Sequence, residues 1–186
     1  MKKITIAFLL MLGILSINAS AQTDSHESFG KTLNLGLGIG GYSGYYGYVG
    51  HTMPVLHADY EFEVGKNFTI APFISFYTYR IKHSWDNNYY YYHETVIPVG
   101  VKGTYYFDQI LNANANWDFY LAGSIGFAIV NSSWDNDYYG DKDYYHGGNP
   151  LFLDLHIGAE YHFNNRTGVF FDLSTGVSTI GLAFHM

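Results

Sequence analysis

Residues 151–163 read LFLDLHIGAEYHF and alternate between two kinds of side chain. Such a period of two is typical of a β-strand whose two faces lie in different surroundings. One face carries Leu151, Leu153, Leu155, Ile157, Ala159, Tyr161 and Phe163, and the other includes Asp154, His156, Gly158, Glu160 and His162. The first face suits hydrocarbon, and the second needs polar partners.

The same pattern predicts eight strands. They are expected at Leu33–Gly40, Leu56–Val64, Phe68–Ile81, Val96–Phe107, Trp117–Val130, Leu151–Phe163, Gly168–Ser174 and Thr179–Met186. Between them, long connections at 41–53, 82–95 and 131–149 alternate with shorter ones. This asymmetry, with an even number of strands, predicts an all-β, eight-stranded antiparallel transmembrane barrel that runs up and down, with both termini in the periplasm.

Aromatic residues indicate which face meets lipid. On the apolar face they gather at the strand ends beside the short turns or the C-terminus. A ring of aromatics at one level is typical of a membrane interface. The expected periplasmic girdle consists of Phe62, Phe68, Tyr105, Phe107, Trp117, Phe119, Tyr161, Phe163 and Phe184.

Two stretches carry a family resemblance: IPVGVKGTYYF at 97–107 and STIGLAFHM at 178–186. With the strand pattern, they resemble the small outer-membrane β-barrel family common in Bacteroidetes, which is similar in architecture to OmpX- and OmpA-type barrels. The resemblance implies an outer-membrane location and assembly by the barrel-assembly machinery. That machinery is thought to read an aromatic residue near the C-terminus, here Phe184.

The N-terminus has the features of an export signal. Met1-Lys2-Lys3 precedes an apolar stretch at 4–17, and Ala19-Ser20-Ala21 offers a cleavage site. We expect a signal peptide at 1–21, a short extension at 22–32 and a barrel domain at 33–186. The chain has no cysteine, so neither a disulfide nor a lipoprotein anchor is expected.

The net charge of the chain indicates which kinds of partner it can bind. Two of the nine Lys and Arg residues leave with the signal, so seven remain against 16 acidic residues, a formal charge of −9. A nucleic-acid partner is therefore not expected. We expect a monomer whose partners are outer-membrane lipid, the assembly machinery and an extracellular ligand.

The polar faces predict a filled lumen. The expected lumen network consists of His57, Asp59, Glu61, Glu63, Lys102, Asp154, His156, Glu160, His162 and Asp172, with His185 on the same parity. In an eight-stranded barrel such residues satisfy one another. A proton or cation path is the alternative interpretation. Gly36–Gly41 matches a dinucleotide-binding pattern, but no helix follows it, so we interpret its glycines as space inside a narrow barrel.

Tyrosine-rich connections are the main functional signal. Tyrosine offers rigid contact area with a hydrogen-bonding tip, and it also suits lipid headgroups. Both interpretations stay open for the candidate recognition residues Tyr45, Tyr46, Trp85, Tyr89, Tyr90, Trp134, Tyr138, Tyr139, Tyr144 and Tyr145.

Other chemistry has weaker support. Asp135, Asp137, Asp141 and Asp143 could ligate calcium but lack EF-hand spacing. Loop sets such as His83, Ser84 and Asp86, or Ser133, Asp135 and His146, keep an enzyme acting on lipid or peptide as an alternative. We expect no catalysis, cofactor or metal, and a barrel that carries loops for recognition, adhesion or envelope stability. A soluble periplasmic ligand-binding barrel is the third possibility.

Overall fold

The computed structural model describes residues 30–41, 53–85, 88–107, 116–134 and 150–186. For Met53, Ile81, His83, Trp85 and Asn88, only the backbone is described. The segment predicted to be a signal peptide and most of the predicted N-terminal extension lie outside these ranges. Within the described chain, no helix has the length and apolarity to cross a membrane.

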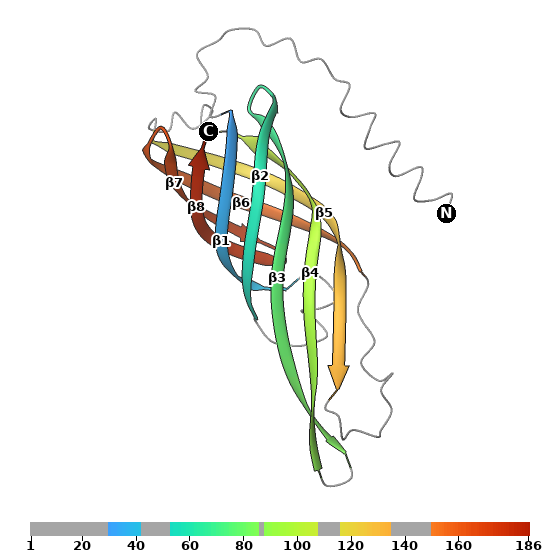
Figure 1. Cartoon of the computed structure of the whole chain (residues 1–186). Helices are drawn as coiled ribbons and strands as arrows, with labels where there is room; N and C mark the ends of the chain where they lie inside the picture. Colours follow the sequence, from blue (N-terminus) through green and yellow to red (C-terminus); the bar gives the residue numbers. More distant parts are fainter. Residues whose placement is uncertain (1–29, 42–52, 86–87, 108–115, 135–149) are drawn as a thin grey trace, which may run out of the picture.

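Eight antiparallel strands form one closed barrel in the order of the sequence, which confirms the predicted fold (Figure 1). They are β1 (Lys31–Gly40), β2 (Met53–Gly65), β3 (Phe68–Trp85), β4 (Asn88–Tyr106), β5 (Trp117–Trp134), β6 (Leu151–Asn164), β7 (Thr167–Ser174) and β8 (Val177–His185). We call the end with the tight turns after β2 and β6 the turn end. The C-terminus lies there as well.

The pairing of β1 with β8 closes the barrel. It runs without a break from Thr32↔His185 to Gly40↔Val177. Beyond it, the Met186 amide donates to the Lys31 carbonyl at 2.8 Å. In the body of the barrel, each of the eight described strands is therefore paired on both sides, which is the condition for spanning hydrocarbon with β-structure.

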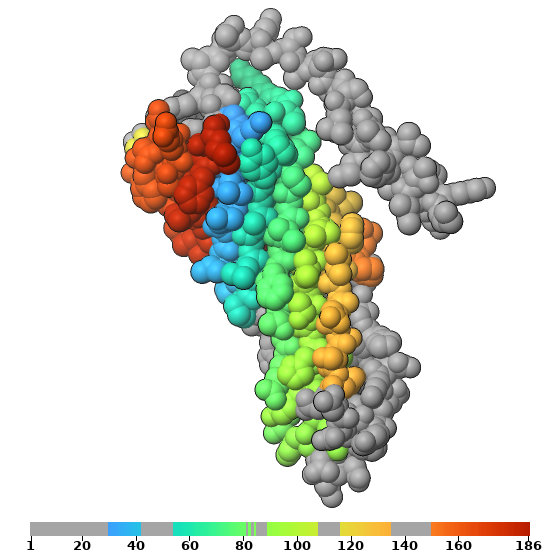
Figure 2. Space-filling model, viewed as in Figure 1, coloured from blue at the N-terminus to red at the C-terminus, as the bar shows by residue number. Residues whose placement is uncertain are grey.

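The apolar faces of the strands point outward. Leu153 and Leu155 are each 69% exposed, whereas Asp154 between them is 2% exposed. A soluble barrel or sandwich would turn its apolar face inward. Figure 2 shows the side chains of β8, β1, β2, β3, β4 and β5 side by side on this outer surface.

Three neighbouring strands extend four or more residues into the long connections that the sequence pattern predicts. We expected a loop at 82–95 and the end of another strand at Val130, but β3 and β4 pair up to Trp85↔Asn88, and β5 reaches Trp134. Tyrosine and threonine favour strands, but here polar and aromatic residues lie on both faces, so the apolar period disappears while pairing continues. The extra length continues past the other strands at the lower edge of Figure 1. We call residues 78–85, 88–95 and 131–134 the projection.

Glycines inside the barrel make room for rings on neighbouring strands. Gly36 of β1 pairs with Gly181 of β8, and Phe170 of β7 packs over both. Phe73 lies over Gly100 and Phe152 over Gly126 in the same way. The inward glycines therefore provide space for neighbouring side chains, as the sequence suggested.

This packing generates a stability prediction for the closing seam. In Gly181→Ala, the added Cβ would lie 2.2 Å from the Leu35 carbonyl oxygen and 2.6 Å from the Phe170 ring. Since backbone and ring must both shift, we expect a loss of about 1 to 3 kcal/mol in the free energy of unfolding. Urea titration of protein refolded into lipid vesicles measures it.

Gly123→Ala is the matched control, because its new Cβ would meet nothing closer than 3.9 Å. We expect it to change stability by less than about 0.5 kcal/mol. Equal penalties for the two variants would contradict the packing described at the seam.

Candidate functional site

Buried charge is concentrated inside the barrel. Among the described residues, six carboxylates are buried, against one lysine, Lys102. The acids are Asp59, Glu61, Glu94, Asp154, Glu160 and Asp172. Such groups are tolerated only where hydrogen bonds or counter-charges replace water.

Asp59 is the centre of the first lumen cluster. Lys102 Nζ donates to Asp59 Oδ2 at 2.9 Å, and Asn34 Nδ2 donates to Oδ1 at 2.9 Å. His57 Nε2 lies 3.1 Å from Oδ2. Three strands, β1, β2 and β4, therefore converge on one carboxylate, and removing the lysine alone would leave a buried, uncompensated charge.

Glu61 extends this cluster toward the turn end. Its Oε1 accepts from the Tyr106 hydroxyl at 2.6 Å and from Thr69 Oγ1. Asn34 Nδ2 also lies 3.3 Å from Oε2. The Tyr106 ring in turn packs edge-on against Tyr120, which leads to the next cluster.

The second cluster joins β5, β6 and β7. Ser124 Oγ lies 2.8 Å from His156 Nε2, and His156 Nδ1 lies 2.7 Å from Asp172 Oδ1. Tyr120 donates to the other Asp172 oxygen at 3.1 Å. A serine on one ring nitrogen and a carboxylate on the other is the order of a serine-hydrolase triad.

A similar chain occurs in the first cluster, where Ser75 Oγ lies 2.8 Å from His57 Nδ1 and Asp59 lies on Nε2. Neither serine is accessible, since Ser75 is 1% and Ser124 6% exposed. A hydrolytic nucleophile must reach a substrate carbonyl beside an oxyanion-binding site. Both chains therefore fit a packed hydrogen-bond network better than a catalytic site.

Asp154 anchors the connection between β7 and β8. It accepts from Thr175 Oγ1 at 2.6 Å, from Ser174 Oγ at 3.0 Å and from the Val177 amide at 3.3 Å. The carboxylate thereby fixes the short connection at the end opposite the turns.

The third lumen cluster lies at the turn end. Glu160 Oε1 is 2.9 Å from His185 Nε2 and 3.7 Å from His162 Nδ1. The other nitrogen of each ring also has an oxygen neighbour, namely Asp118 Oδ2 at 2.8 Å for His162 and Thr32 Oγ1 at 2.9 Å for His185. Two imidazoles are thus held against one carboxylate.

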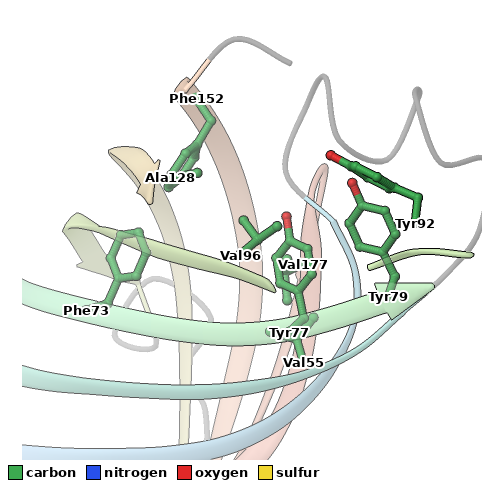
Figure 3. Packing of buried hydrophobic residues seen from close by; sticks show 9 residues of the cluster. All are labelled: Val55, Phe73, Tyr77, Tyr79, Tyr92, Val96, Ala128, Phe152 and Val177. Carbon is green, nitrogen blue, oxygen red and sulfur yellow. The ribbon is translucent and has the colours of Figure 1, made fainter. Parts of the chain in front are cut away.

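The opposite end of the lumen is apolar and aromatic (Figure 3). Its core cluster consists of Val55, Phe73, Tyr77, Tyr79, Tyr92, Val96, Ala128, Phe152 and Val177. Within it, the hydroxyls of Tyr79 and Tyr92 both donate to Glu94. The cluster thus continues from the lumen into the projection, to which Tyr79 and Tyr92 belong.

The structure places nine of the ten predicted lumen residues in these clusters. Glu63 is the correction: it has inward parity but is exposed near the end of β2, beside the turn. Sequence reasoning missed Glu94, which lay in the expected loop. It also missed Asn34, Ser75 and Ser124, since small polar residues give no charge signal.

The predicted girdle residues lie on the outer face near the turn end. Trp117 packs on Tyr161 with ring centroids 4.9 Å apart, and Tyr161 contacts Phe163 at 5.6 Å. Phe68 pairs with Tyr105 across β3 and β4, and Phe107 follows the end of β4. Tyr60, which was not included in the prediction, packs edge-on against Phe62.

Only some of the predicted recognition residues fall in the described chain. Tyr45, Tyr46, Tyr138, Tyr139, Tyr144, Tyr145 and Asp135–Asp143 lie outside it, as do Asp86 and His146 of the possible catalytic sets. Trp85, Tyr89, Tyr90 and Trp134 are in strands of the projection, which corrects their assignment to loops. Trp134 packs on Tyr92 at 5.1 Å, whereas Tyr89 is 64% exposed.

The outer face of the projection pairs cations with tyrosines. The Arg80 guanidinium lies 3.4 Å from the centre of the Tyr91 ring, and Lys82 Nζ lies 3.6 Å from that of Tyr89. Such contacts hold long side chains against a rigid surface while their charge stays exposed.

Of two similar solved structures, the one with the higher TM-score supports this architecture. Neisserial surface protein A is 12% identical, with a TM-score of 0.53 over 84% of this chain and 96% of that one. Ail, the attachment invasion locus protein of Yersinia pestis, is 9% identical, with a TM-score of 0.41 over 84% and 96%. No family model matches this chain, and neither does any curated protein. The fold is that of a small eight-stranded outer-membrane β-barrel.

The buried serines generate a labelling prediction. A fluorophosphonate probe, which marks activated serines, should not label the folded protein, since neither Ser75 nor Ser124 is accessible. Labelling is read by intact mass, with the unfolded chain as the background control. Rapid labelling of the folded barrel that disappears in Ser124→Ala or Ser75→Ala would revive the enzyme alternative.

Proposed function

We propose that the chain is exported with its signal peptide removed and becomes an integral, non-catalytic outer-membrane protein of the small Bacteroidetes-type barrel family. Its barrel is the membrane anchor of an extracellular projection that serves recognition, adhesion or envelope stability. One observation carries the proposal: on three neighbouring strands, the outward side chains change from apolar to polar at the same level.

That level is marked by Thr78, Thr95 and Asn131, which are paired across β3, β4 and β5. Toward the turn end, the outward residues of β5 are Leu121, Gly123, Ile125, Phe127 and Ile129. From Phe119 in the girdle to Ile129 is ten residues, or about 25 Å along the axis of a tilted strand, the height of an outer-membrane apolar band. The projection therefore begins where the hydrocarbon would end.

The projection is suited to recognition because its backbone is ordered before any partner arrives. Pairing of β3 with β4 continues to Trp85↔Asn88, and Tyr92 packs beneath it against Trp134. A partner would not have to order this surface, so little affinity is lost to entropy. Its exposed chemistry, with Arg80 and Lys82 over tyrosine rings, suits anionic or sugar-bearing groups at the cell surface.

The first prediction tests the membrane assignment. Ile157 is outward and 53% exposed, and it is paired with Leu121 of β5 and Leu173 of β7. Ile157→Arg should cost about 2 to 4 kcal/mol in the free energy of unfolding in lipid, as a cation near the middle of the bilayer. Urea titration of protein refolded into vesicles measures this cost.

Asn131→Arg is the control, because Asn131 is also outward but lies at the proposed edge of the band. We expect about 0 to 1 kcal/mol there. If both arginines cost the same, the outer face does not meet hydrocarbon and the soluble alternative gains support.

A second prediction tests the projection. Because Tyr79 pairs with Glu94, residues 80–93 can be replaced by Asn-Gly, a turn that closes such a hairpin. We expect the shortened protein to fold, shown by different migration of boiled and unboiled samples. Cells that carry it should lose adhesion to an epithelial monolayer or tolerance of bile salts, compared with cells that carry the full protein.

The two readouts separate recognition from envelope stability. A folded, surface-exposed short form that preserves both properties would show that the projection serves neither role. The membrane assignment would then still stand on the Ile157 comparison.

A further inference from the structure

The cluster at the turn end has the composition of a metal site. Glu160, His162 and His185 each offer one ligand atom, and these three atoms all lie within 4.8 Å of one another. The residues are 5%, 6% and 9% exposed. Two imidazole nitrogens and one carboxylate oxygen are a common ligand set for zinc, with a fourth position for water.

The contacts on the far side of the two rings, away from Glu160, also favour a metal site. His162 Nε2 faces Asp118 Oδ2 at 2.8 Å, and the carboxylate is best satisfied if that nitrogen carries the proton. In a neutral ring, Nδ1 then presents a lone pair toward Glu160 Oε1, 3.7 Å away. Two lone pairs that face each other in a buried site need a cation between or beside them.

The second ring is oriented in a comparable way. Thr32 Oγ1 lies 2.9 Å from His185 Nδ1, and Nε2 is directed at the same Glu160 oxygen. Carboxylate or hydroxyl partners on the far nitrogen are the usual means by which proteins fix a metal-binding histidine. Each histidine of the cluster has one.

The neighbouring strand leaves room for the carboxylate. Gly168 of β7 lies between β6 and β8, pairing with His162 on one side and Ala183 on the other. A Cβ there would lie 2.3 Å from Glu160 Oε1. The missing side chain allows the carboxylate to lie over β7, between the two histidines.

Charge in the lumen also favours a bound cation. Lys102 is the one buried lysine or arginine of the described chain, and its ammonium contacts Asp59 in the first cluster. The buried Glu160 therefore needs another source of positive charge, either a protonated histidine or a metal ion.

We propose that Glu160, His162 and His185 bind a divalent transition metal such as zinc, with Asp118 and Thr32 orienting the two histidines. The metal would join β6 to β8 across β7 near the C-terminus of the barrel. Its role is structural, since the three ligands are buried and the site is at the end of the barrel opposite the projection.

The test measures zinc binding to folded protein in detergent micelles after chelator treatment. Titration against a chromogenic zinc chelator, with metal content by mass spectrometry, should give one tightly bound zinc per barrel. Cobalt in its place should give the visible absorption of a tetrahedral site. His162→Ala removes a ligand and should weaken the affinity for zinc at least tenfold. Asp118→Asn preserves all three ligands but removes the carboxylate that orients His162, and it should weaken the affinity by about ten- to a hundredfold.

His156→Ala is the matched control. His156 is on the same strand and also contacts a carboxylate, Asp172, at 2.7 Å, but it is not part of the three-ligand group. This variant should bind zinc like the unchanged protein. Each variant is first shown to be folded by its migration with and without boiling, and Asp118→Asn provides the test if His162→Ala does not fold.

Two results would overturn the proposal. If the unchanged protein binds no zinc, the cluster is held by a protonated histidine alone. If His162→Ala and Asp118→Asn both bind zinc as tightly as the unchanged protein, the metal lies elsewhere in the chain.

Discussion

Closure of the sheet between β1 and β8 is the constraint on which the rest of the molecule depends. A strand pair with an open edge could not face hydrocarbon, because each unpaired amide and carbonyl would cost several kcal/mol there. Once the edge is closed, the side chains must divide between a narrow interior and an apolar exterior. The exposed Leu153 and Leu155 and the buried Asp154 follow from this division.

The narrow interior also determines how buried charges are stabilised. With no room for bulk water, each carboxylate requires donors from facing strands, as Asp59 receives from Lys102 and Asn34. Large rings fit only where the next strand carries glycine, as Phe170 does over Gly36 and Gly181. The polar clusters and the glycine positions are thus two results of one spatial limit.

Alternation in eight segments, together with the unequal connections and the positions of the aromatic residues, was enough to predict the barrel, its strand order and the outward direction of the apolar faces. It failed at 82–95, because tyrosine and polar residues on both faces remove the apolar period, although β-propensity and pairing persist. Contacts between strands were also beyond reach. His162 and His185 lie on β6 and β8, and only the registers of both with β7 place them beside Glu160. A period of two assigns a residue to a face but not to a neighbour.

The unequal strand lengths give the barrel a direction within the plane of the membrane. Among the described residues, β3, β4 and β5 rise as one wall, whereas β7 and β8 stop at a short connection fixed by Asp154 (Figure 1). The described strands therefore offer a paired surface beyond the body of the barrel on the side of β3, β4 and β5, and none on the side of β7 and β8. A partner that contacts this surface would be held to one side of the barrel axis.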